Sequence, residues 1–426
     1  MPETNSLVTL IEKLSQNIIA LFGLLIIAIL IIVFSLVFIR RSGPVTKLGI
    51  GPKGLEIEFE TGIYLNGIPQ LPKSNPIRQS FEKGQKCINN EKYKDALVFL
   101  NEALGNNPSN EQKTAIYNFI GVCHLLLGNY LEAEDNLIKS SKLALKREGK
   151  STAFGNLGIA YDKRGVLEKA LEYYQKALDI DRELNNKEGI ARAYKNIGIV
   201  FKKKGMRGKA LEYYQKALDI DRELNNKKGI AKSYMNIGVV DRLEKNYDNA
   251  LYHFHKSLNT YKEFGIKEGA AIAYGNIGNV YLQKKEYEKA LSFYQEGLEI
   301  DKELDRTEGM AIKYGNIGNV YMAIGNLDLA LEYYKKGMDL DKEMDRKEGL
   351  AFKLGNIGIV FEKKKNYDKA LKYFNEALII AYDGEFFEVT EAFLPQLIAI
   401  YQRQNNHEKI QELLLKFKKK FPQLKI

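Results

Sequence analysis

The sequence predicts an all-α solenoid of about nine helix-turn-helix units. The first observation is a forty-residue period, in which Asn-x-Gly recurs and Ala-Leu begins twelve residues after each of its glycines. The second is that apolar residues within each unit fall three or four apart, the spacing of one helix face. A fixed period of this size indicates stacked units that bury their apolar faces against their neighbours. The Asn-x-Gly pairs are Asn156/Gly158, Asn196/Gly198, Asn236/Gly238, Asn276/Gly278, Asn316/Gly318 and Asn356/Gly358, and the Ala-Leu pairs begin at Ala170, Ala210, Ala250, Ala290, Ala330 and Ala370.

The composition is that of a folded protein with basic character. Charged residues make up 28% of the 426 residues and hydrophobic residues 45%, as in globular chains. The net charge of +10 and the pI of about 9.1 favour acidic proteins, anionic lipid or nucleic acid as partners. Two cysteines, Cys87 and Cys123, are too few for a disulfide framework and fit a reducing compartment. Four histidines form no ligand-like cluster, so no metal and no cofactor is expected.

Residues 18–39 form an uncharged apolar run, which predicts a transmembrane helix. A secretory signal peptide, the alternative, would have a basic start, a shorter apolar region and a small-residue cleavage site. Here Glu3 and Glu12 precede the run and Arg40-Arg41 follow it directly. The basic flank predicts a single-pass protein with residues 1–17 outside and the array in the cytoplasm. Abundant Lys, Ile and Asn with no Trp point to a prokaryotic plasma (inner) membrane.

Residues 40–76 are a linker between the predicted span and the array. Leu55 to Glu60 alternates apolar and acidic residues, the period of a strand, after the turn sequence Gly51-Pro52-Lys53-Gly54. A β-hairpin over 47–60 and a plain spacer both remain open. The array is expected over 77–426.

Residues 149–188 illustrate one unit. Apolar residues from Ala153 to Tyr161 mark one face of a first helix, Gly165 ends it, and residues from Ala170 to Leu178 mark one face of a second helix. Glycine inside a helix costs about 1 kcal/mol relative to alanine, so the recurring Gly158 position predicts a close approach between helices. The aromatic at the Tyr174 position is expected in the core between hairpins.

These residues carry a clear resemblance to the tetratricopeptide repeat family. A small residue or glycine on the first helix, an aromatic three residues later, and Ala-x-x-x-aromatic-x-x-Ala on the second helix are its signature. The forty-residue length is similar to the long-helix variants of kinesin light chain, Partner of Inscuteable and bacterial regulatory repeat proteins. The resemblance covers residues 77–421 and implies a right-handed superhelix that binds proteins rather than an enzyme. The units are expected near 77–110, 111–148, 149–188, 189–228, 229–268, 269–308, 309–348, 349–388 and, as a cap, 389–426.

By the same resemblance, the first helix of each hairpin lines a concave binding face. Residues 169–187 and 209–227, which cover second helices, are identical over 19 positions. The first helices, 151–166 and 191–206, share only 6 of 16 positions. A groove with a varied inner face would produce this difference, and so would drift after a duplication.

An asparagine ladder on the first helices is the predicted peptide-binding feature. A side-chain amide donates and accepts hydrogen bonds together, which suits capture of an extended peptide backbone. The alternative is that these amides tie neighbouring helices to each other. The ladder consists of Asn156, Asn196, Asn236, Asn276, Asn316 and Asn356, with Asn279 and Asn319 one turn further on.

The predicted groove changes from basic to apolar along the array. Arg192, Lys195, Lys202 and Lys232, with Lys203 and Arg242, are expected on or near the concave side of the fourth and fifth units. Ile272, Leu282, Ile312 and Met322 occupy matching positions in the next two units. This order predicts a ligand with an acidic and a hydrophobic segment, although lysine runs are also common on solvated faces. The many Asp and Glu residues are expected on such faces.

The leading function is a membrane-anchored protein–protein interaction adaptor, and the alternative is a structural scaffold that self-assembles at the membrane as a homo-oligomer. Nucleic acid is a disfavoured partner, because no recognition motif accompanies the lysine runs 202–204 and 418–420. C-terminal lysines touching anionic lipid are a further alternative. No phosphate-cradling loop and no catalytic arrangement is present, so the chain is not expected to be an enzyme.

Overall fold

The computed structural model describes residues 48–51, 54–58, 64–66, 72, 74–90 and 92–424. The chain divides into two compact units, Met1–Gly43 and Pro44–Ile426. The predicted membrane span, 18–39, lies outside the described residues. Among the residues that are described, no helix is both long enough and apolar enough to cross a membrane.

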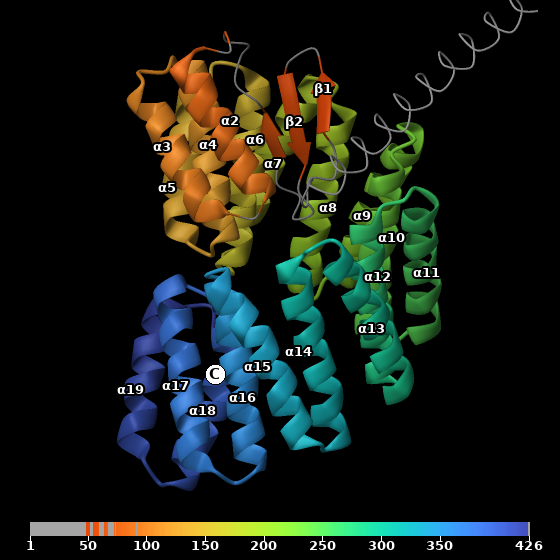
Figure 1. Ribbon diagram of the computed structural model, residues 1–426, viewed down its shortest axis with the longest axis vertical. Coiled ribbons are helices and arrows are strands. Elements are labelled where there is room, and N and C mark those ends of the chain that lie inside the picture. The colour runs from red at the N-terminus through yellow and green to blue at the C-terminus, as the bar shows by residue number, and fades with distance from the viewer. Residues whose placement is uncertain are drawn as a thin grey trace, which may run out of the picture. The chain divides into compact units, whose positions relative to one another are not determined.

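Eighteen helices form nine antiparallel hairpins over residues 76–420 (Figure 1). The first helix of each hairpin carries an even number and the second an odd number. The hairpins are α2 (Pro76–Asn89) and α3 (Tyr93–Gly105), α4 (Asn110–Leu126) and α5 (Tyr130–Leu143), α6 (Arg147–Lys163) and α7 (Leu167–Glu183), α8 (Lys187–Lys203) and α9 (Arg207–Glu223), α10 (Lys227–Leu243) and α11 (Tyr247–Glu263), α12 (Lys267–Gln283) and α13 (Tyr287–Glu303), α14 (Thr307–Ile324) and α15 (Leu327–Glu343), α16 (Lys347–Lys363) and α17 (Tyr367–Gly384), and α18 (Phe387–Arg403) and α19 (His407–Lys420).

A three-stranded antiparallel sheet precedes the hairpins. Its strands are β1 (Leu48–Gly51), β2 (Gly54–Glu58) and β3 (Tyr64–Asn66), in the order β1-β2-β3. Leu48 pairs with Ile57, and Gly51 pairs with Gly54. These two strands lie within the segment for which the sequence left a hairpin and a spacer open. The helices in contact with β3 are α4 and α6.

The glycine of each Asn-x-Gly lies under the aromatic ring of its own second helix. A Cβ at Gly278 would lie 2.6 Å from Cε1 of Tyr294, and a Cβ at Gly318 would lie 2.7 Å from Cδ1 of Tyr334. Real side chains do not tolerate such distances, so only glycine fits here. Both tyrosines are at most 1% exposed. The predicted close approach is therefore present, and the group that fills the space is the ring rather than the backbone of the second helix.

Buried aspartates join consecutive hairpins. Asp181, Asp221, Asp301 and Asp341 lie in the last turns of second helices and are at most 2% exposed. The expectation that the acidic residues of the repeat lie on solvated faces is wrong at these four positions. Each carboxylate abuts the first turn of the following helix, where a Cβ at Gly189 or Gly309 would collide with it. Burying a carboxylate costs free energy unless it is paired, so each needs a local donor.

The donors to these carboxylates differ along the array. Asn186 Nδ2 donates to Asp181 Oδ1 over 2.9 Å, whereas Asp301 lies 2.8 Å from Arg306 Nη1 and 3.1 Å from Lys313 Nζ. Burial raises the pKa of Asp181, and Arg192 and Asn186 act against that shift. The hairpins are thus joined by polar contacts as well as by apolar packing.

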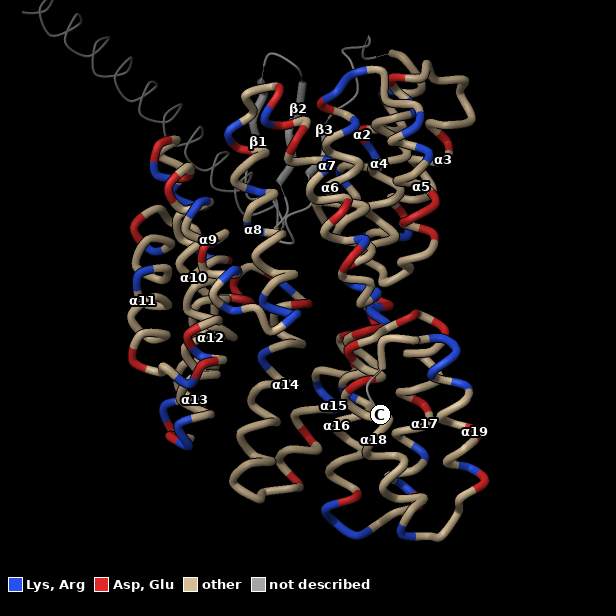
Figure 2. The backbone as a smooth tube through the Cα atoms, turned by 180° about the vertical axis from the view of Figure 1, so that it is seen from behind, with Lys and Arg blue, Asp and Glu red and all other residues tan. Residues whose placement is uncertain are grey.

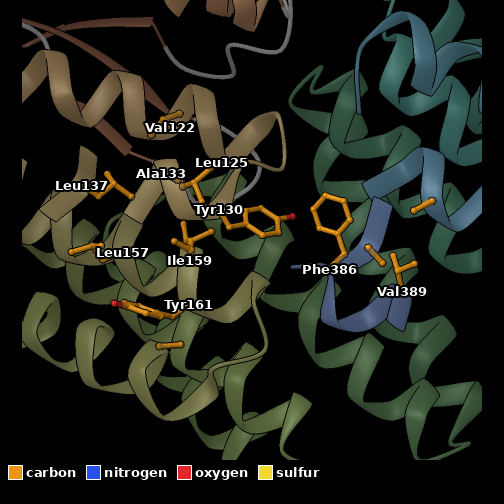
Figure 3. Close-up of a cluster of buried hydrophobic side chains, with 14 of the residues drawn as sticks. Val122, Leu125, Tyr130, Ala133, Leu137, Leu157, Ile159, Tyr161, Phe386 and Val389 are labelled. Atoms are coloured by element: carbon orange, nitrogen blue, oxygen red, sulfur yellow. The ribbon is translucent and has the colours of Figure 1, made fainter. Parts of the chain in front are cut away.

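The array also contacts itself across hairpins that are distant in sequence. Residues 128–134 and 164–165 lie against Glu348 and residues 385–388, and we call this contact the closing interface. Its apolar centre is the edge-to-face pair of Tyr130 and Phe386, with ring centroids 5.7 Å apart (Figure 3). Phe386 is fully buried, and the Tyr130 hydroxyl donates to Glu348 Oε2 over 2.8 Å.

Ion pairs and glycine turns surround that centre. Arg164 contacts Glu134 on its own side of the interface and Glu385 on the other side. Its Nε lies 2.6 Å from Oε2 of Glu385. Gly165 has a φ of +74°, and a Cβ there would lie 2.8 Å from Cγ of Phe387. Gly205 occupies the same turn position in the next hairpin with the same φ, and a Cβ built there would meet no described non-neighbouring atom within 4 Å. At the closing interface, an aromatic ring fills the space beside the turn glycine Gly165. The equivalent space beside Gly205 is empty of described side chains.

Candidate functional site

The first helices form the inner wall of the array. Consecutive first helices contact each other, as α6 does with α8, and α10 does with α8 and α12. Contacts between consecutive second helices are sparser. A stack whose elements are closer on one side curves toward that side, so the concave face lies over the first helices. All twelve residues of the predicted groove lie on α6, α8, α10, α12, α14 and α16.

The first rung of the asparagine ladder joins neighbouring helices. Asn156 is 1% exposed, and its Nδ2 donates to Asn118 Oδ1 on α4 over 3.0 Å. Asn196 is also buried, at 8% exposure. At Asn156 the amide thus ties neighbouring helices to each other, as the alternative interpretation of the ladder expected. It has fewer hydrogen-bonding groups left for a ligand.

Further along, the amides are half-buried and differently engaged. Asn276 Nδ2 donates to the carbonyl of Ile272 in its own helix over 3.2 Å. The Nδ2 of Asn236 is buried and has no hydrogen-bond partner among the described residues. Asn316 and Asn356 are half-buried. The ladder is therefore not a uniform set, and among its described rungs Asn236 has a donor that is buried and unused.

Asn279 and Asn319 serve the core. Their Oδ1 atoms accept hydrogen bonds from the hydroxyls of Tyr294 and Tyr334 over 2.6 and 2.7 Å. A buried hydroxyl without a partner costs about 1–3 kcal/mol, so these two amides stabilise their own hairpins. Tyr214 has Ile199 at the matching position, and its hydroxyl is buried without a partner among the described residues.

Three of the predicted basic groove residues have partners inside the array. Lys195 Nζ lies 2.9 Å from Asp221 Oδ2, and its side chain is 12% exposed. Arg192 lies within electrostatic range of Asp181, and Lys232 is half-buried and has a partner. The tube view shows the wider pattern, in which Lys and Arg are interspersed with Asp and Glu along the helices (Figure 2). Lys195, Arg192 and Lys232 are thus engaged within the array.

Lys202 and Arg242 are different. They occupy the same position in the last turns of α8 and α10, and neither side chain makes a hydrogen bond or ion pair within the described part of the chain. Burial lowers the pKa of Lys202, and the neighbouring Lys203 and Arg242 lower it further, while Asp162 and Glu388 act against them. Burial likewise lowers the pKa of Arg242, whose Nε is buried without an acceptor. Two neighbouring, partly desolvated cations whose side chains make no ion pair among the described residues would be stabilised by an added anion.

Apolar side chains follow the cationic pair along the inner wall. Leu282 and Met322 continue the column of Lys202 and Arg242 on α12 and α14 and are half-buried. Ile272 is half-buried, and Ile312 is 42% exposed. Half-buried side chains thus occupy this one position on four consecutive first helices, with Lys202 and Arg242 followed by Leu282 and Met322.

The described residues contain no group of three or more His, Cys, Asp or Glu side chains that could hold a metal ion. Cys123 is buried, and burial raises the pKa of its thiol. Cys87 is half-buried, and burial is also the main cause of its raised pKa. Raised thiol pKa values reduce the thiolate fraction, which is the reactive form.

Sequence reasoning missed two features. The buried aspartates were grouped with the solvated acids, although each is followed eight residues later by a glycine, as Asp181 is by Gly189. That recurring spacing of aspartate and glycine is a sequence pattern that indicates the buried aspartates. The closing interface has no such signal, because Glu385 and Phe386 occupy the same helix-junction position as Asp345 and Arg346 in the preceding unit, and nothing in the repeat marks them for a distant contact.

Comparisons with known proteins agree with the repeat architecture. A family model described as Tetratricopeptide repeat matches residues 112–183, 151–223, 229–303 and 309–382, which together cover more than half of the chain. Sperm-associated antigen 1 of Homo sapiens is 33% identical over 97 residues, or 23% of this chain. That segment spans only 9% of the length of the human protein.

Several solved structures share the fold. A Rap protein complexed with Competence and Sporulation Factor has a TM-score of 0.58 at 18% identity, covering 74% of this chain and 89% of that one. Aspartyl phosphate phosphatase F from Bacillus subtilis has a TM-score of 0.51 at 13% identity, covering 74% and 96%. The apo form of RapI has a TM-score of 0.50 at 18% identity, covering 63% and 99%. At these identities the likeness concerns the fold alone.

Proposed function

The chain belongs to the tetratricopeptide repeat family, and we propose that it is a membrane-tethered adaptor whose concave face captures a protein segment with acidic residues followed by apolar ones. The observation that carries this proposal is the pair Lys202 and Arg242, two half-buried cations on consecutive first helices whose side chains make no ion pair within the described part of the chain. A partner carboxylate would gain charge-assisted hydrogen bonds there.

The apolar part of the segment would lie against the following units. Leu282, Met322 and Ile312 offer partly exposed apolar surface next to the cationic pair. Burial contributes about 25 cal/mol per Å² of apolar surface, whereas the charges set register and orientation. The unbonded amide of Asn236 adds one donor for the backbone of the ligand. The Rap structure with Competence and Sporulation Factor is an example of this fold with a ligand in place.

A peptide-selection experiment tests the proposal. The full chain is incubated with an immobilised library of random peptides, and the recovered sequences are read. We expect enrichment of Asp and Glu ahead of Leu, Ile and Phe. The double substitution Lys202→Gln with Arg242→Gln should abolish the acidic enrichment and weaken binding by about 2–5 kcal/mol, as for lost buried charge pairs.

Lys216→Gln is the matched control. Lys216 is 46% exposed on α9, a second helix, and pairs with Glu212, so its loss should leave the selected sequences unchanged. If the wild-type chain recovers peptides without acidic enrichment, the proposed ligand is wrong.

The tether is the uncharged run 18–39, followed by Arg40 and Arg41. A run of this length spans a bilayer, and the basic flank would hold the array on the cytoplasmic side of a prokaryotic inner membrane. We expect the chain to remain in the membrane pellet after alkaline carbonate extraction. Ile27→Lys combined with Ile31→Lys should release it, because each charge at the bilayer centre costs about 2.5–3.5 kcal/mol. Release of the unaltered chain by carbonate would exclude the tether.

A further inference from the structure

Lys203, the residue after Lys202, forms an ion pair with a carboxylate on the other side of the closing interface. Lys203 Nζ lies 2.9 Å from Oε1 of Glu388, the second residue of α18. The same amine lies 3.2 Å from Asp162 Oδ2 in the preceding hairpin. The fourth hairpin is therefore linked to the ninth through one lysine, beside Lys202.

Glu388 is present there as a charged carboxylate. Burial alone would raise its pKa, but Lys203, Lys163 and Lys202 lower it below the usual value. Burial likewise acts to lower the pKa of Lys203, and Asp162 and Glu388 together raise it. The α18 carboxylate is thus stabilised by the same group of cations that the proposed ligand would use.

We propose that Glu388 is an internal competitor for the acidic ligand, so that ligand binding at Lys202, Lys203 and Arg242 releases α18 and opens the closing interface. The inference rests on the proposed function, because it assigns an acidic segment to the same cations. Two carboxylates compete for one cationic cluster, and the coupling is reciprocal: opening of the interface raises affinity for the ligand by the factor by which the ligand favours opening.

The closing interface is suited to release without unfolding of the hairpins. Its polar contacts are the hydrogen bond from Tyr130 to Glu348 and ion pairs that retain some access to solvent, such as Arg164 with Glu385 at 18% and 14% side-chain exposure. Its apolar centre is one aromatic pair, Tyr130 with Phe386, together with Phe387 over a glycine turn. The hairpins themselves are joined by full helix faces and fully buried aspartates. The weaker of the two kinds of contact is the one that opens first.

Zero-length carbodiimide cross-linking of the full chain measures the closure without added labels. Lys94 and Asp345 form an ion pair of 2.8 Å between the first and seventh hairpins, and both are exposed. Lys187 and Glu223 form one of 2.9 Å within the fourth hairpin and are similarly exposed. The ratio of the first cross-linked peptide to the second, read by mass spectrometry, reports closure at constant hairpin structure.

The probe is a short peptide in which two glutamates precede a leucine and an isoleucine, and its partner carries glutamines in place of the glutamates. We expect the acidic peptide to lower the cross-link ratio and the glutamine peptide to leave it unchanged. Glu388→Gln should lower the ratio without any peptide and should tighten binding of the acidic peptide about fivefold or more. Glu391→Gln, an exposed acid one turn further along α18, is the control and should change neither.

The outcomes separate the two proposals. If wild type binds the acidic peptide and Glu388→Gln leaves both affinity and cross-link ratio unchanged, the competitor role is excluded and the proposed ligand stands. If neither wild type nor Glu388→Gln binds the acidic peptide, the proposed ligand fails and the inference fails with it. An unchanged Lys187–Glu223 yield in every variant shows that the hairpins remain folded.

Discussion

At the scale of single residues, glycine is required at different positions of this chain for different physical reasons. Gly318 makes room for the ring of Tyr334, whereas Gly189 makes room for the carboxylate of Asp181 and the amide of Asn186. Gly165 combines a left-handed backbone with the space that Phe387 needs. Gly208, in the first turn of α9, has nothing within 4 Å of a built Cβ. Glycines of the same repeat array thus differ in the atoms that the methyl group of an alanine substitution would contact.

Gly189→Ala and Gly208→Ala should therefore shift stability in opposite directions. At Gly189 the new methyl overlaps Asp181 and forces a shift in a packed junction, which costs about 1–3 kcal/mol. At Gly208 the methyl enters open space and improves helix propensity by up to about 1 kcal/mol. Urea unfolding of the full chain, followed by circular dichroism, gives both midpoints. Equal midpoints for the two variants would contradict the assigned role of Gly189.

At the scale of helices, the repeat admits a buried lysine only where the neighbouring positions are small. Lys313 is 3% exposed and reaches Asp301 between α12, α13 and α14. Its Cε lies 3.3 Å from a Cβ built on Gly275 and 2.6 Å from one built on Gly297. Lys353 repeats the arrangement one unit later with Gly315 and Gly337. The glycines and the lysine form one packing unit spread over three helices.

Asp301→Ala should destabilise the array by about 3–5 kcal/mol, because Lys313 and Arg306 would lose the carboxylate that compensates their buried charges. Glu332→Ala removes an exposed partner of Lys336 and should change stability by less than about 1 kcal/mol. Thermal unfolding of the two variants is the measurement. A loss as small for Asp301 as for Glu332 would show that the buried network contributes little.

The sequence predicted the hairpins because they depend on local periodicity. Gly158 and Tyr174 are close in sequence and recur, so helix spacing alone places them together. The unpaired state of the Lys202 side chain could not be predicted, because it depends on which neighbours are neutralised: Lys195, two turns earlier on the same face of α8, is bound to Asp221. The pairing of Lys313 with Asp301 was missed for the same reason, since a buried charge and a solvated charge look alike in a periodic pattern.

At the scale of the whole array, the closing interface was beyond sequence reasoning. The hydrogen bond between Tyr130 and Glu348 joins residues 218 positions apart, and its position depends on the summed rotation of all the hairpins between them. A small error in each hairpin would move the two halves apart. Only the three-dimensional structure shows that Arg164 and Glu385 meet.

This contact gives the array a folding order. Each hairpin can form as soon as its own residues leave the ribosome, because its contacts are local and such contacts form quickly. Tyr130 and Arg164 then remain without their contacts across the closing interface, because Glu385 is synthesised 221 residues after Arg164. During that interval the surface that Phe386 later covers faces water. The last hairpin therefore acts as a completion signal, and a chain that stops short of it carries an uncovered aromatic patch that quality-control proteases and chaperones recognise.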